Sequence, residues 1–337
     1  MKERAMCEIS VVTSVYNAKE YIGETIESVQ NQTFDSWEFI IIDDCSSDGS
    51  GEVIKRYADN DDRIRYICNK QNAGQCANLN KGIKLATGKY IARLDHDDLC
   101  MPDRFERQYR YMENHPDVGL IGCRELGLKN GKIKKIMSDT AITTAEEMRF
   151  SSLFFQPMGH SSFFIRRETM ENNNIWYGQY DYAEDYALIC DLIGVGKVER
   201  MDEHLVVYRY SPTMTSKTTS EEIKNSEIIA IQKEYLKKIG YEKNSSIICE
   251  ANEGKLAGYK RTREFEKALS DFAEFCGVSV KRNEINQCVK DAFLFTLLRQ
   301  KGDFGMAAAY FVSGLRQKGW LPDKRDIRML IKGVIGR

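Results

Sequence analysis

The sequence is poor in proline and histidine and carries no excess of either charge. Of its 337 residues, 5 are proline and 4 are histidine, and 49 lysines and arginines balance 50 aspartates and glutamates. So few prolines exclude a proline-rich linker protein. A nucleic-acid-binding protein usually has a clear basic excess, so no nucleic-acid partner is expected for a chain with a net charge of −1.

Long apolar runs and paired cysteines are also missing. No run approaches the roughly 18 apolar residues that a membrane-spanning helix needs. The N-terminal stretch MKERAMCEISVV lacks the apolar core of a secretion signal. None of the 10 cysteines belongs to a Cys-x-x-Cys pair, and the histidines do not cluster with them, so neither a zinc site nor a disulfide framework is expected. These features favour a cytoplasmic protein with reduced thiols.

The first hundred residues alternate short apolar runs with segments of helical length. Runs rich in β-branched residues occur at 9–15, 37–42, 64–68 and 89–94. Between the first two, Ile22, Ile26 and Val29 recur at helical spacing. Because parallel strands need such long crossovers, the sequence predicts an α/β fold whose mostly parallel sheet has helices on both faces.

Two further regions follow this part of the chain. Residues 99–215 mix a helix after Pro102 and a helix at 184–193 with a hairpin turn at Asn130–Gly131 and strands at 118–123, 161–165, 197–201 and 205–208. From 216 to 337 amphipathic helices dominate, with apolar faces such as Ala268, Leu269, Phe272 and Phe275, and later Phe293, Leu294, Leu297 and Leu298. We therefore predict an α/β domain at 1–215 and a helical C-terminal region at 216–337.

Three of the predicted strands end in polar or acidic residues, at TSVYN (13–17), DD (43–44) and DHDD (95–98). Ligands of open α/β sheets bind outside the carboxyl ends of the strands. Carboxylates that gather there repel one another unless a cation neutralises them, and an Asp-x-Asp pair supplies the oxygen ligands that Mg²⁺ and Mn²⁺ prefer. Strand-end aspartates can instead cap the following helix, which is the interpretation we favour for Asp48.

Two common nucleotide-binding loops are absent. No Gly-x-Gly-x-x-Gly follows the first strand, and no Gly-Lys-Ser/Thr phosphate loop occurs. A nucleotide bound at this sheet would therefore have its phosphates held mainly by a metal ion.

Three blocks together resemble a known family. They are VVTSVYNAKEYIGETIESVQNQTFDSWEFIIIDDCSSDGS, then NAGQCANLNKGIKLATGKYIARLDHDD, then YAEDYAL. Their order and spacing are similar to those of the family 2 inverting glycosyltransferases with the GT-A fold. The resemblance covers residues 7–215, and it implies a nucleotide-binding half at about 1–98 and an acceptor half at 99–215.

The resemblance implies a role for each strand-end residue. Thr13 and Tyr16 match the positions that receive the uracil or equivalent base, Tyr16 through its ring face. Asp44 matches the carboxylate that accepts the base N–H, and Asp95 matches the ribose contact. Asp97 matches the ligand of a divalent cation, Mn²⁺ or Mg²⁺.

The later blocks supply candidate residues for the chemistry. Asp185 matches the general base, with Glu184 beside it, although acidic residues at a helix start are also favoured by the helix dipole alone. His160 is a candidate acceptor or phosphate contact, or a structural histidine. The preceding aromatic residues are either an acceptor platform or core packing: Trp176, Tyr177, Tyr180 and Tyr182.

A segment near the end of the resemblance departs from the family pattern. Arg209 and Ser216 lie where the family often has a phosphate-binding segment. Many members have a histidine after that arginine, whereas this chain has Tyr210.

We therefore predict a metal-dependent inverting glycosyltransferase. It would move a sugar from a nucleotide-diphospho-sugar, expected to be a UDP-sugar, to a hydroxyl of a glycan or lipid-linked acceptor in polysaccharide synthesis. The alternatives are a nucleotidyltransferase, which usually has a Gly-rich basic loop after the first strand, and a catalytically silent protein that binds sugar nucleotides.

The last residues of the chain are basic. Residues 315–337 contain seven basic and two acidic side chains, a net charge of +5, together with Trp320 and seven leucine, isoleucine and valine residues. This composition predicts peripheral contact with the inner face of the cell membrane, while a last helix packed on the catalytic domain is the alternative.

Overall fold

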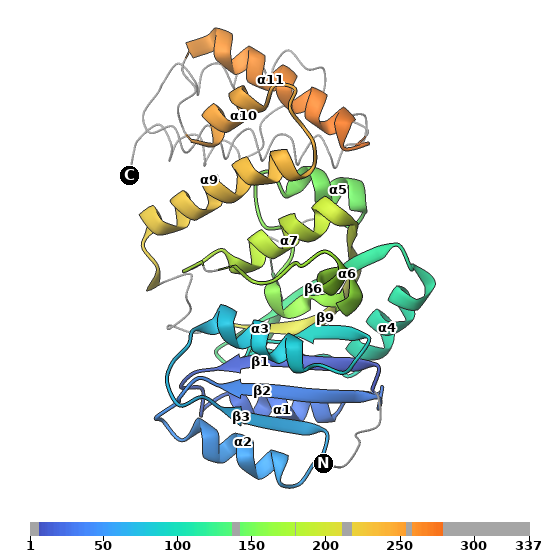
Figure 1. Cartoon of the computed structure of the whole chain (residues 1–337), viewed down its shortest axis with the longest axis vertical. Helices are drawn as coiled ribbons and strands as arrows, with labels where there is room; N and C mark the ends of the chain where they lie inside the picture. The colour runs from blue at the N-terminus through green and yellow to red at the C-terminus, as the bar shows by residue number, and fades with distance from the viewer. Residues whose placement is uncertain (1–6, 137–141, 179, 211–217, 254–257, 279–337) are drawn as a thin grey trace. The chain divides into compact units, whose positions relative to one another are not determined.

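The structure, a computed structural model, describes residues 7–136, 142–178, 180–210, 218–253 and 258–278 (Figure 1). The chain divides into two compact units, one from Met1–Met148 and Gln156–Lys224 and the other from Arg149–Phe155 and Asn225–Arg337. The domain boundary predicted after residue 215 falls outside the described residues. No helix in the described ranges is long and apolar enough to cross a membrane.

Four parallel strands form the first half of the sheet. They are β1 (Ile9–Val15), β2 (Trp37–Asp43), β3 (Ile64–Cys68) and β4 (Tyr90–Arg93), in the order β3-β2-β1-β4. Every residue of β2 and all of β1 except Ser14 are buried, because helices cover both faces. The four strands and their parallel arrangement confirm the sequence-based prediction.

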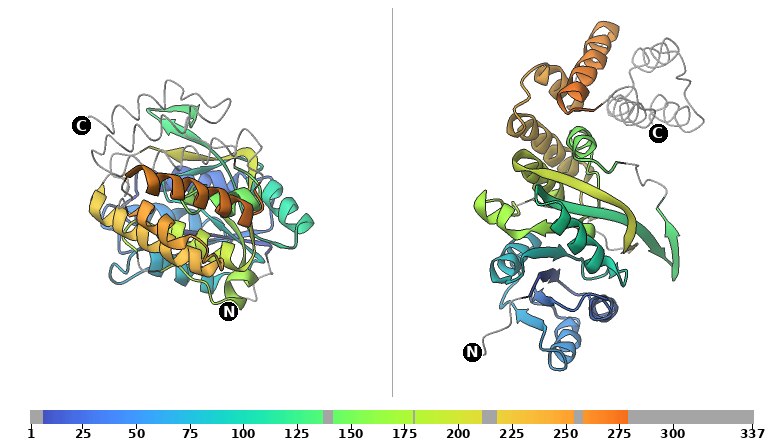
Figure 2. Two further views of the ribbon diagram at one scale, coloured as in Figure 1. Left: turned by 90° about the horizontal axis from the view of Figure 1, so that it is seen from above. Right: turned by 90° about the vertical axis from the view of Figure 1, so that its right-hand side faces the viewer.

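Helices cover this half of the sheet on both sides. α1 (Ile22–Gln30) and α2 (Ser50–Ala58) lie on one face, and α3 (Gln75–Leu85) lies on the other (Figures 1 and 2). α3 packs closely on β1, since a Cβ on Gly82 would lie 2.5 Å from Cγ1 of Val12. The prediction of helices on both faces is confirmed.

The second half of the sheet is mixed. β8 (Phe164–Arg166) joins β4 antiparallel, and β6 (Val118–Lys129), β9 (Lys197–Arg209) and β5 (Leu99–Cys100) follow in that order. β7 (Lys132–Lys135) pairs with β6 as a hairpin, through a turn in which Asn130 and Gly131 have φ of 51° and 70°. The predicted hairpin is thus confirmed. The helices of this part are α4 (Arg104–Asn114), α5 (Ala145–Ser151), α6 (Arg167–Asn172) and α7 (Glu184–Val195).

Two predicted strand boundaries are wrong. Residues 197–201 and 205–208 belong to one strand, β9, because its polar middle pairs with β6 through register shifts, and Asp202 forms an ion pair with Arg124. The strand predicted at 161–165 starts only at Phe164. His160–Ser162 form a 3₁₀ turn instead, in which the Ser162 hydroxyl donates to the Gly159 carbonyl.

The second unit is helical in the described residues. α9 (Glu221–Lys238) leads into it, and α10 (Ser245–Asn252) and α11 (Gly258–Phe275) follow. Ala268, Leu269 and Phe272 are buried, as predicted for α11, whereas Phe275 is 40% exposed. The helix predicted around Phe293–Leu298 and the basic segment 315–337 lie outside the described residues.

Candidate functional site

The carboxyl ends of β1, β2 and β4 lie side by side at one edge of the parallel sheet. Val15 of β1 is paired with Asp43 of β2, and the backbone N–H of Asp44 donates to the Val15 carbonyl at 2.8 Å. The buried Thr13 hydroxyl donates to the Leu94 carbonyl at 2.7 Å, which ties β1 to the chain just after β4. The parallel topology therefore brings together the polar strand ends that the sequence singled out.

Tyr16 and Asp44 lie at this edge in different environments. Tyr16 is 52% exposed, so much of its surface is accessible to a ligand. Asp44 is buried and accepts hydrogen bonds from the Asn69 side chain and from the backbone N–H groups of Ala73 and Gly74, at 2.8–2.9 Å. Burial would raise the pKa of Asp44, but these hydrogen bonds outweigh burial and lower it, so the carboxylate is ionised and anchors the loop before α3.

The acidic loop 95–98 has three differently engaged carboxylates. Asp95 accepts from Nη2 of Arg93 at 2.6 Å and from the Ser161 hydroxyl at 3.0 Å. Asp98 accepts from the Ser161 hydroxyl at 2.5 Å and from the backbone N–H of Arg209 at 2.8 Å. Within the described residues, the Asp97 carboxylate accepts no hydrogen bond from another side chain or from another residue's backbone.

The charges near the three carboxylates of this loop, together with burial, shift their pKa values. Burial acts to raise the pKa of Asp95, but the charge of Arg93 and its hydrogen bond, together with the nearby histidines, outweigh burial and lower it. Burial, with the added charge of Asp95, raises the pKa of Asp97, and burial together with both neighbouring charges raises the pKa of Asp98 well above its usual range. Such repulsion among carboxylates is relieved when a cation or a proton binds.

Asp97 fits a divalent cation because its donor is a carboxylate that no other described side chain hydrogen-bonds. No group of three or more potential metal ligands occurs among the described residues. Mg²⁺ and Mn²⁺ do not require such a group, since Mg²⁺ is usually held by one or two carboxylates, water and the phosphates of a substrate. The residues present are therefore compatible with a cation bound together with a diphosphate.

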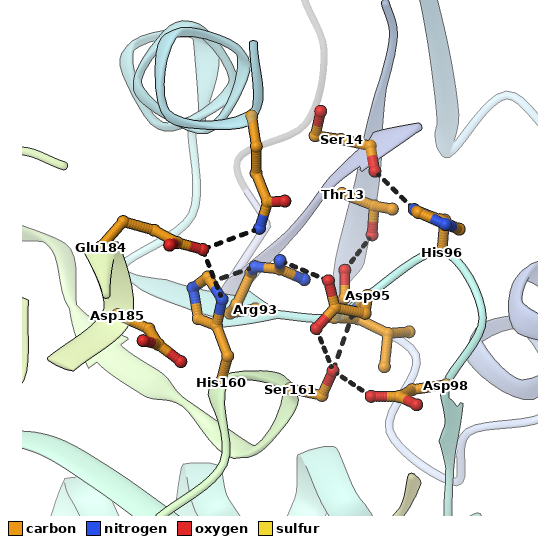
Figure 3. Close-up of polar contacts among 12 residues, drawn as sticks. Thr13, Ser14, Arg93, Asp95, His96, Asp98, His160, Ser161, Glu184 and Asp185 are labelled. Atoms are coloured by element: carbon orange, nitrogen blue, oxygen red, sulfur yellow. Dashed lines mark hydrogen bonds and ion pairs between the residues drawn. The ribbon is translucent and has the colours of Figure 1, made fainter. Parts of the chain in front are cut away.

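A buried polar cluster lies beside the acidic loop (Figure 3). His160 Nε2 lies 3.2 Å from Nε of Arg93 and 2.7 Å from the Tyr177 hydroxyl, and His160 Nδ1 lies 3.9 Å from Oε1 of Glu184. Glu184 also accepts from the Gln75 side chain at 3.2 Å. The cluster joins β4, the 160–162 turn, α3 and the start of α7.

The protonation state of His160 follows from its partners. An arginine Nε can only donate, so the Nε2 of His160 must accept and the neutral ring carries its proton on Nδ1. Burial and the adjacent Arg93 charge hold the pKa of His160 well below its usual value. His160 is therefore a neutral residue whose Nε2 contacts both Arg93 and the Tyr177 hydroxyl.

Glu184 and Asp185 begin α7 beside this polar cluster and are largely removed from water. Burial, with the charge of Asp185, raises the pKa of Glu184 to about 8. Burial raises the pKa of Asp185 to about 6, although Gln156 donates to one oxygen at 2.5 Å and the Tyr186 N–H to the other at 2.7 Å. A carboxylate with a pKa near neutrality and a fixed orientation can accept a proton from a hydroxyl.

Arg209 is held by the acidic loop. Its Nε donates to the Asp97 carbonyl at 2.8 Å, and its Nη2 forms a 2.6 Å ion pair with Glu24. These contacts place the positive charge of Arg209 next to Asp97. Ser216, the other predicted residue of that segment, lies outside the described residues.

The predicted aromatic group is not an open platform. Tyr177 is buried, and Trp176, Tyr180 and Tyr182 are each only partly exposed. Lys84 lies over the Trp176 ring, and Lys224 lies over the Tyr182 ring.

Sequence reasoning missed Arg93, Ser161 and Gln156. Arg93 is 2% exposed, and its Nη1 is buried without a hydrogen-bond partner among the described residues. The available signal was an arginine inside an otherwise apolar strand, KYIARL. Nothing in the local sequence of Gln156 or Ser161 signals a contact with a residue far along the chain.

Solved structures share this GT-A-like α/β fold. S. aureus TarS in complex with UDP matches with a TM-score of 0.59 at 17% identity, over 97% of this chain and 89% of that chain. The mannosyltransferase PcManGT from Pyrobaculum calidifontis, in complex with GDP-Man and Mn²⁺, matches with a TM-score of 0.52 at 14% identity, over 98% of this chain and 87% of that one. At these identities the likeness concerns the fold.

Sequence comparison identifies the family. The sequence model described as "Glycosyl transferase family 2" matches residues 10–173. A Haemophilus influenzae protein described as an uncharacterized glycosyltransferase is 30% identical over 244 residues, 69% of this chain and 75% of that protein. TuaG of Bacillus subtilis, named for teichuronic acid biosynthesis, is 40% identical over 104 residues, 31% of this chain and 41% of that protein. The chain therefore belongs to glycosyl transferase family 2 and is a glycosyltransferase.

Proposed function

We propose that this glycosyltransferase is metal-dependent and inverting, and that its donor is a nucleotide-diphospho-sugar, most simply a UDP-sugar. The observation that carries the proposal is the position of two partly buried carboxylates with raised pKa, Glu184 and Asp185, beside the acidic strand-end loop at the edge of the parallel sheet. That edge is where ligands of open α/β sheets bind.

On the donor side, Tyr16 would stack on the base, Asp44 would accept the base N–H, and Asp95 would bind the ribose. The exposed Tyr16 ring and the ionised state of Asp44 support these roles. Thr13 has its hydroxyl proton engaged by Leu94, so it would contact the base through its remaining lone pairs or its methyl group. The UDP bound by TarS, a protein of the same fold, supports a UDP-sugar as donor.

On the leaving-group side, Asp97 would hold Mn²⁺ or Mg²⁺ together with the diphosphate. A bound divalent ion would act as a Lewis acid that neutralises the charge of the departing nucleoside diphosphate. The Mn²⁺ in the PcManGT complex supports this use of a metal. Arg209, bonded to the Asp97 carbonyl, would add positive charge at the same end, in line with its predicted phosphate contact.

On the acceptor side, Asp185 would act as the general base. The acceptor hydroxyl would lose its proton to a carboxylate oxygen of Asp185 while its oxygen bonds to C1 of the sugar. The C1–O bond to the diphosphate would break on the opposite face, which inverts the configuration in a single displacement. Glu184 and His160, whose side chains lie 3.9 Å apart, would contact the acceptor or a phosphate.

These roles imply a function for each region of the chain. We propose that residues 1–98 bind the nucleotide, that 99–215 bind the acceptor, and that 216–337 form a separate helical region. The acceptor would be a glycan or a lipid-linked intermediate of a polysaccharide, as the name of TuaG suggests. The basic tail would hold the enzyme at the inner face of the membrane, with the rest of the protein in the cytoplasm.

The donor assignment is tested by offering nucleotide-sugars with and without Mn²⁺ and measuring the nucleotide released. Metal-dependent release of UDP from one of them is expected, whereas a silent binding protein would release none. A nucleotidyltransferase would also release no UDP from a nucleotide-sugar, but it would release pyrophosphate when given a nucleoside triphosphate and a sugar 1-phosphate.

Calorimetry with UDP and Mn²⁺ tests the binding residues. Asp97→Ala should abolish the metal-dependent part of UDP binding, and Tyr16→Ala should weaken binding by about 1–3 kcal/mol, the scale of a base–aromatic stack. Unchanged UDP affinity in the Asp97 variant would remove that residue from the metal site.

A further inference from the structure

The β6–β7 hairpin carries a cluster of lysines, which we call the lysine hairpin: Lys129, Lys132, Lys134 and Lys135. These side chains, with Gly127, Asn130, Ile136 and Tyr210, line a hollow of about 670 Å³. All four lysines are exposed, and none forms an ion pair within the described residues. The hairpin extends away from the rest of its sheet (Figure 2, right).

The pairing of the hairpin concentrates this charge on one face. Lys129 lies directly opposite Lys132, and Lys134 lies opposite Gly127. Side chains two residues apart on a strand share a face, so three of the ammonium groups stand together. Like charges directly opposite one another destabilise a hairpin, so the arrangement has a cost that a bound anion would remove.

An aromatic ring lies on the same face. Tyr210 is 40% exposed, and a Cβ on Gly127 would lie 2.7 Å from Cε2 of its ring. Tyr208 supports this ring edge-on, at 5.2 Å between centroids. Glycine at position 127 therefore leaves space for a flat ring surrounded by lysines, a combination that suits a sugar ring carrying negative charge.

The hollow and the candidate site are connected through the end of β9. The Tyr210 N–H donates to the Leu128 carbonyl at 3.0 Å, and Leu128 pairs with Arg209. Arg209 is the residue whose Nε donates to the Asp97 carbonyl. The end of β9 therefore contacts both the lysine hairpin and the acidic loop, and an acceptor of several sugar units bound at the hairpin would extend from one to the other.

We propose that the lysine hairpin binds the acceptor, and that this acceptor is an anionic glycan with carboxylate or phosphate groups along its length. The proposal rests on the proposed function and names its acceptor class. Lysine, a compact and strongly hydrated charge, suits such groups at variable spacing. A membrane surface fits less well, because the lysines and Tyr210 line a hollow, and Ile133 is the only large aliphatic side chain on β7.

The test compares binding of an end-labelled galacturonic acid oligomer with binding of a neutral glucose oligomer of equal length, by fluorescence anisotropy. The charged oligomer should bind, and the neutral one should not. The triple variant Lys129→Gln, Lys132→Gln, Lys134→Gln should raise the Kd at least tenfold. A control variant with three exposed lysines replaced elsewhere, Lys55→Gln, Lys197→Gln, Lys237→Gln, should leave it unchanged.

A second pair of variants distinguishes a defined binding site from general attraction between the lysines and an anion. Tyr210→Ala should weaken binding severalfold even in about 0.5 M salt, where the lysine charges are screened, and Tyr210→Phe should not. Equal affinity in the two lysine variants, or binding to anionic lipid vesicles with no binding to the charged oligomer, would overturn the proposal.

The outcome is distinguishable from failure of the proposed function. Metal-dependent UDP release from the donor does not involve the hairpin, so it should be the same in the triple variant and the wild type. Loss of oligomer binding with unchanged donor hydrolysis supports the acceptor surface, whereas a wild type without donor hydrolysis contradicts the proposed function and leaves the oligomer measurement to be judged separately.

Discussion

At the scale of single residues, the candidate site keeps ionisable groups in conditions that cost stability. Glu184 and Asp185 are carboxyl groups largely removed from water, and the pKa of each is raised. A carboxyl group whose pKa is higher in the folded protein binds its proton more tightly there than in the unfolded chain. Stability then falls as the pH rises from the unfolded pKa, about 4.3 for a glutamate, toward the folded value of about 8 for Glu184.

Glu184→Gln should therefore stabilise the protein in a pH-dependent way. The amide has no charge to bury, so the gain in melting temperature should be larger at pH 8 than at pH 5, with about 2–4 °C for each kcal/mol recovered. Scanning calorimetry at both values measures it, with Glu168→Gln as a control on an exposed glutamate of α6. A gain of equal size at both pH values would mean that Glu184 is not strained by burial of its charge.

At the scale of elements, Arg93 links β4 to the start of α7. Its charge acts to lower the pKa of Asp95, Asp185 and Glu184, and within the described residues its buried Nη1 has no hydrogen-bond partner. Arg93 on β4 thus acts electrostatically on Asp185, the proposed base at the start of α7.

Arg93→Gln should shift the pH dependence of transfer. The base must be deprotonated, so kcat/KM should fall about tenfold per pH unit below the pKa of the carboxylate pair and level off above it. Without the Arg93 charge this acid limb should move to higher pH, whereas Arg93→Lys, which keeps the charge, should leave it in place. An acid limb at the same pH in the Gln variant would show that Arg93 does not act on the base.

The strands and helices show how much of the fold could be predicted from the sequence. The strands at 9–15, 37–43, 64–68 and 90–93 and the helices between them follow from local apolar periodicity. The polar middle of β9 suggested a break between two strands in the sequence. In the structure this segment pairs with β6 through register shifts, which no local sequence pattern encodes.

Some residues of the candidate site could also be predicted from the sequence, whereas others could not. The strand-end residues Tyr16, Asp44 and Asp97 are apparent in the sequence, because the topology of a parallel sheet gathers its carboxyl ends. The contact between Gln156 and Asp185 joins segments 29 positions apart, and it depends on tertiary packing. The burial that raises the pKa of Asp185 is likewise a property of the folded protein.

At the scale of the whole molecule, the charge is unevenly distributed. Residues 315–337 carry a net +5, so the remainder of the chain carries −6. Each basic side chain near an anionic lipid surface contributes about 1 kcal/mol, which is enough for reversible association when several act together.

The full chain should sediment with vesicles that contain anionic lipids, and salt should reduce the amount bound. A chain that ends at Gly314 should lose most of this binding, because it lacks the basic segment and Trp320. Equal sedimentation with anionic and neutral vesicles, or no loss on truncation, would contradict a membrane role for this segment.

The central claim is that Asp185 is the base of a sugar transfer from a nucleotide donor. The most direct test measures Asp185→Asn in two assays, donor binding by calorimetry with Mn²⁺ and sugar transfer to the acceptor. The asparagine keeps the shape of the side chain but cannot take a proton, so donor affinity should be unchanged while the transfer rate falls by about 10²–10⁴-fold. Transfer by the variant at a rate near that of the wild type would contradict the assignment.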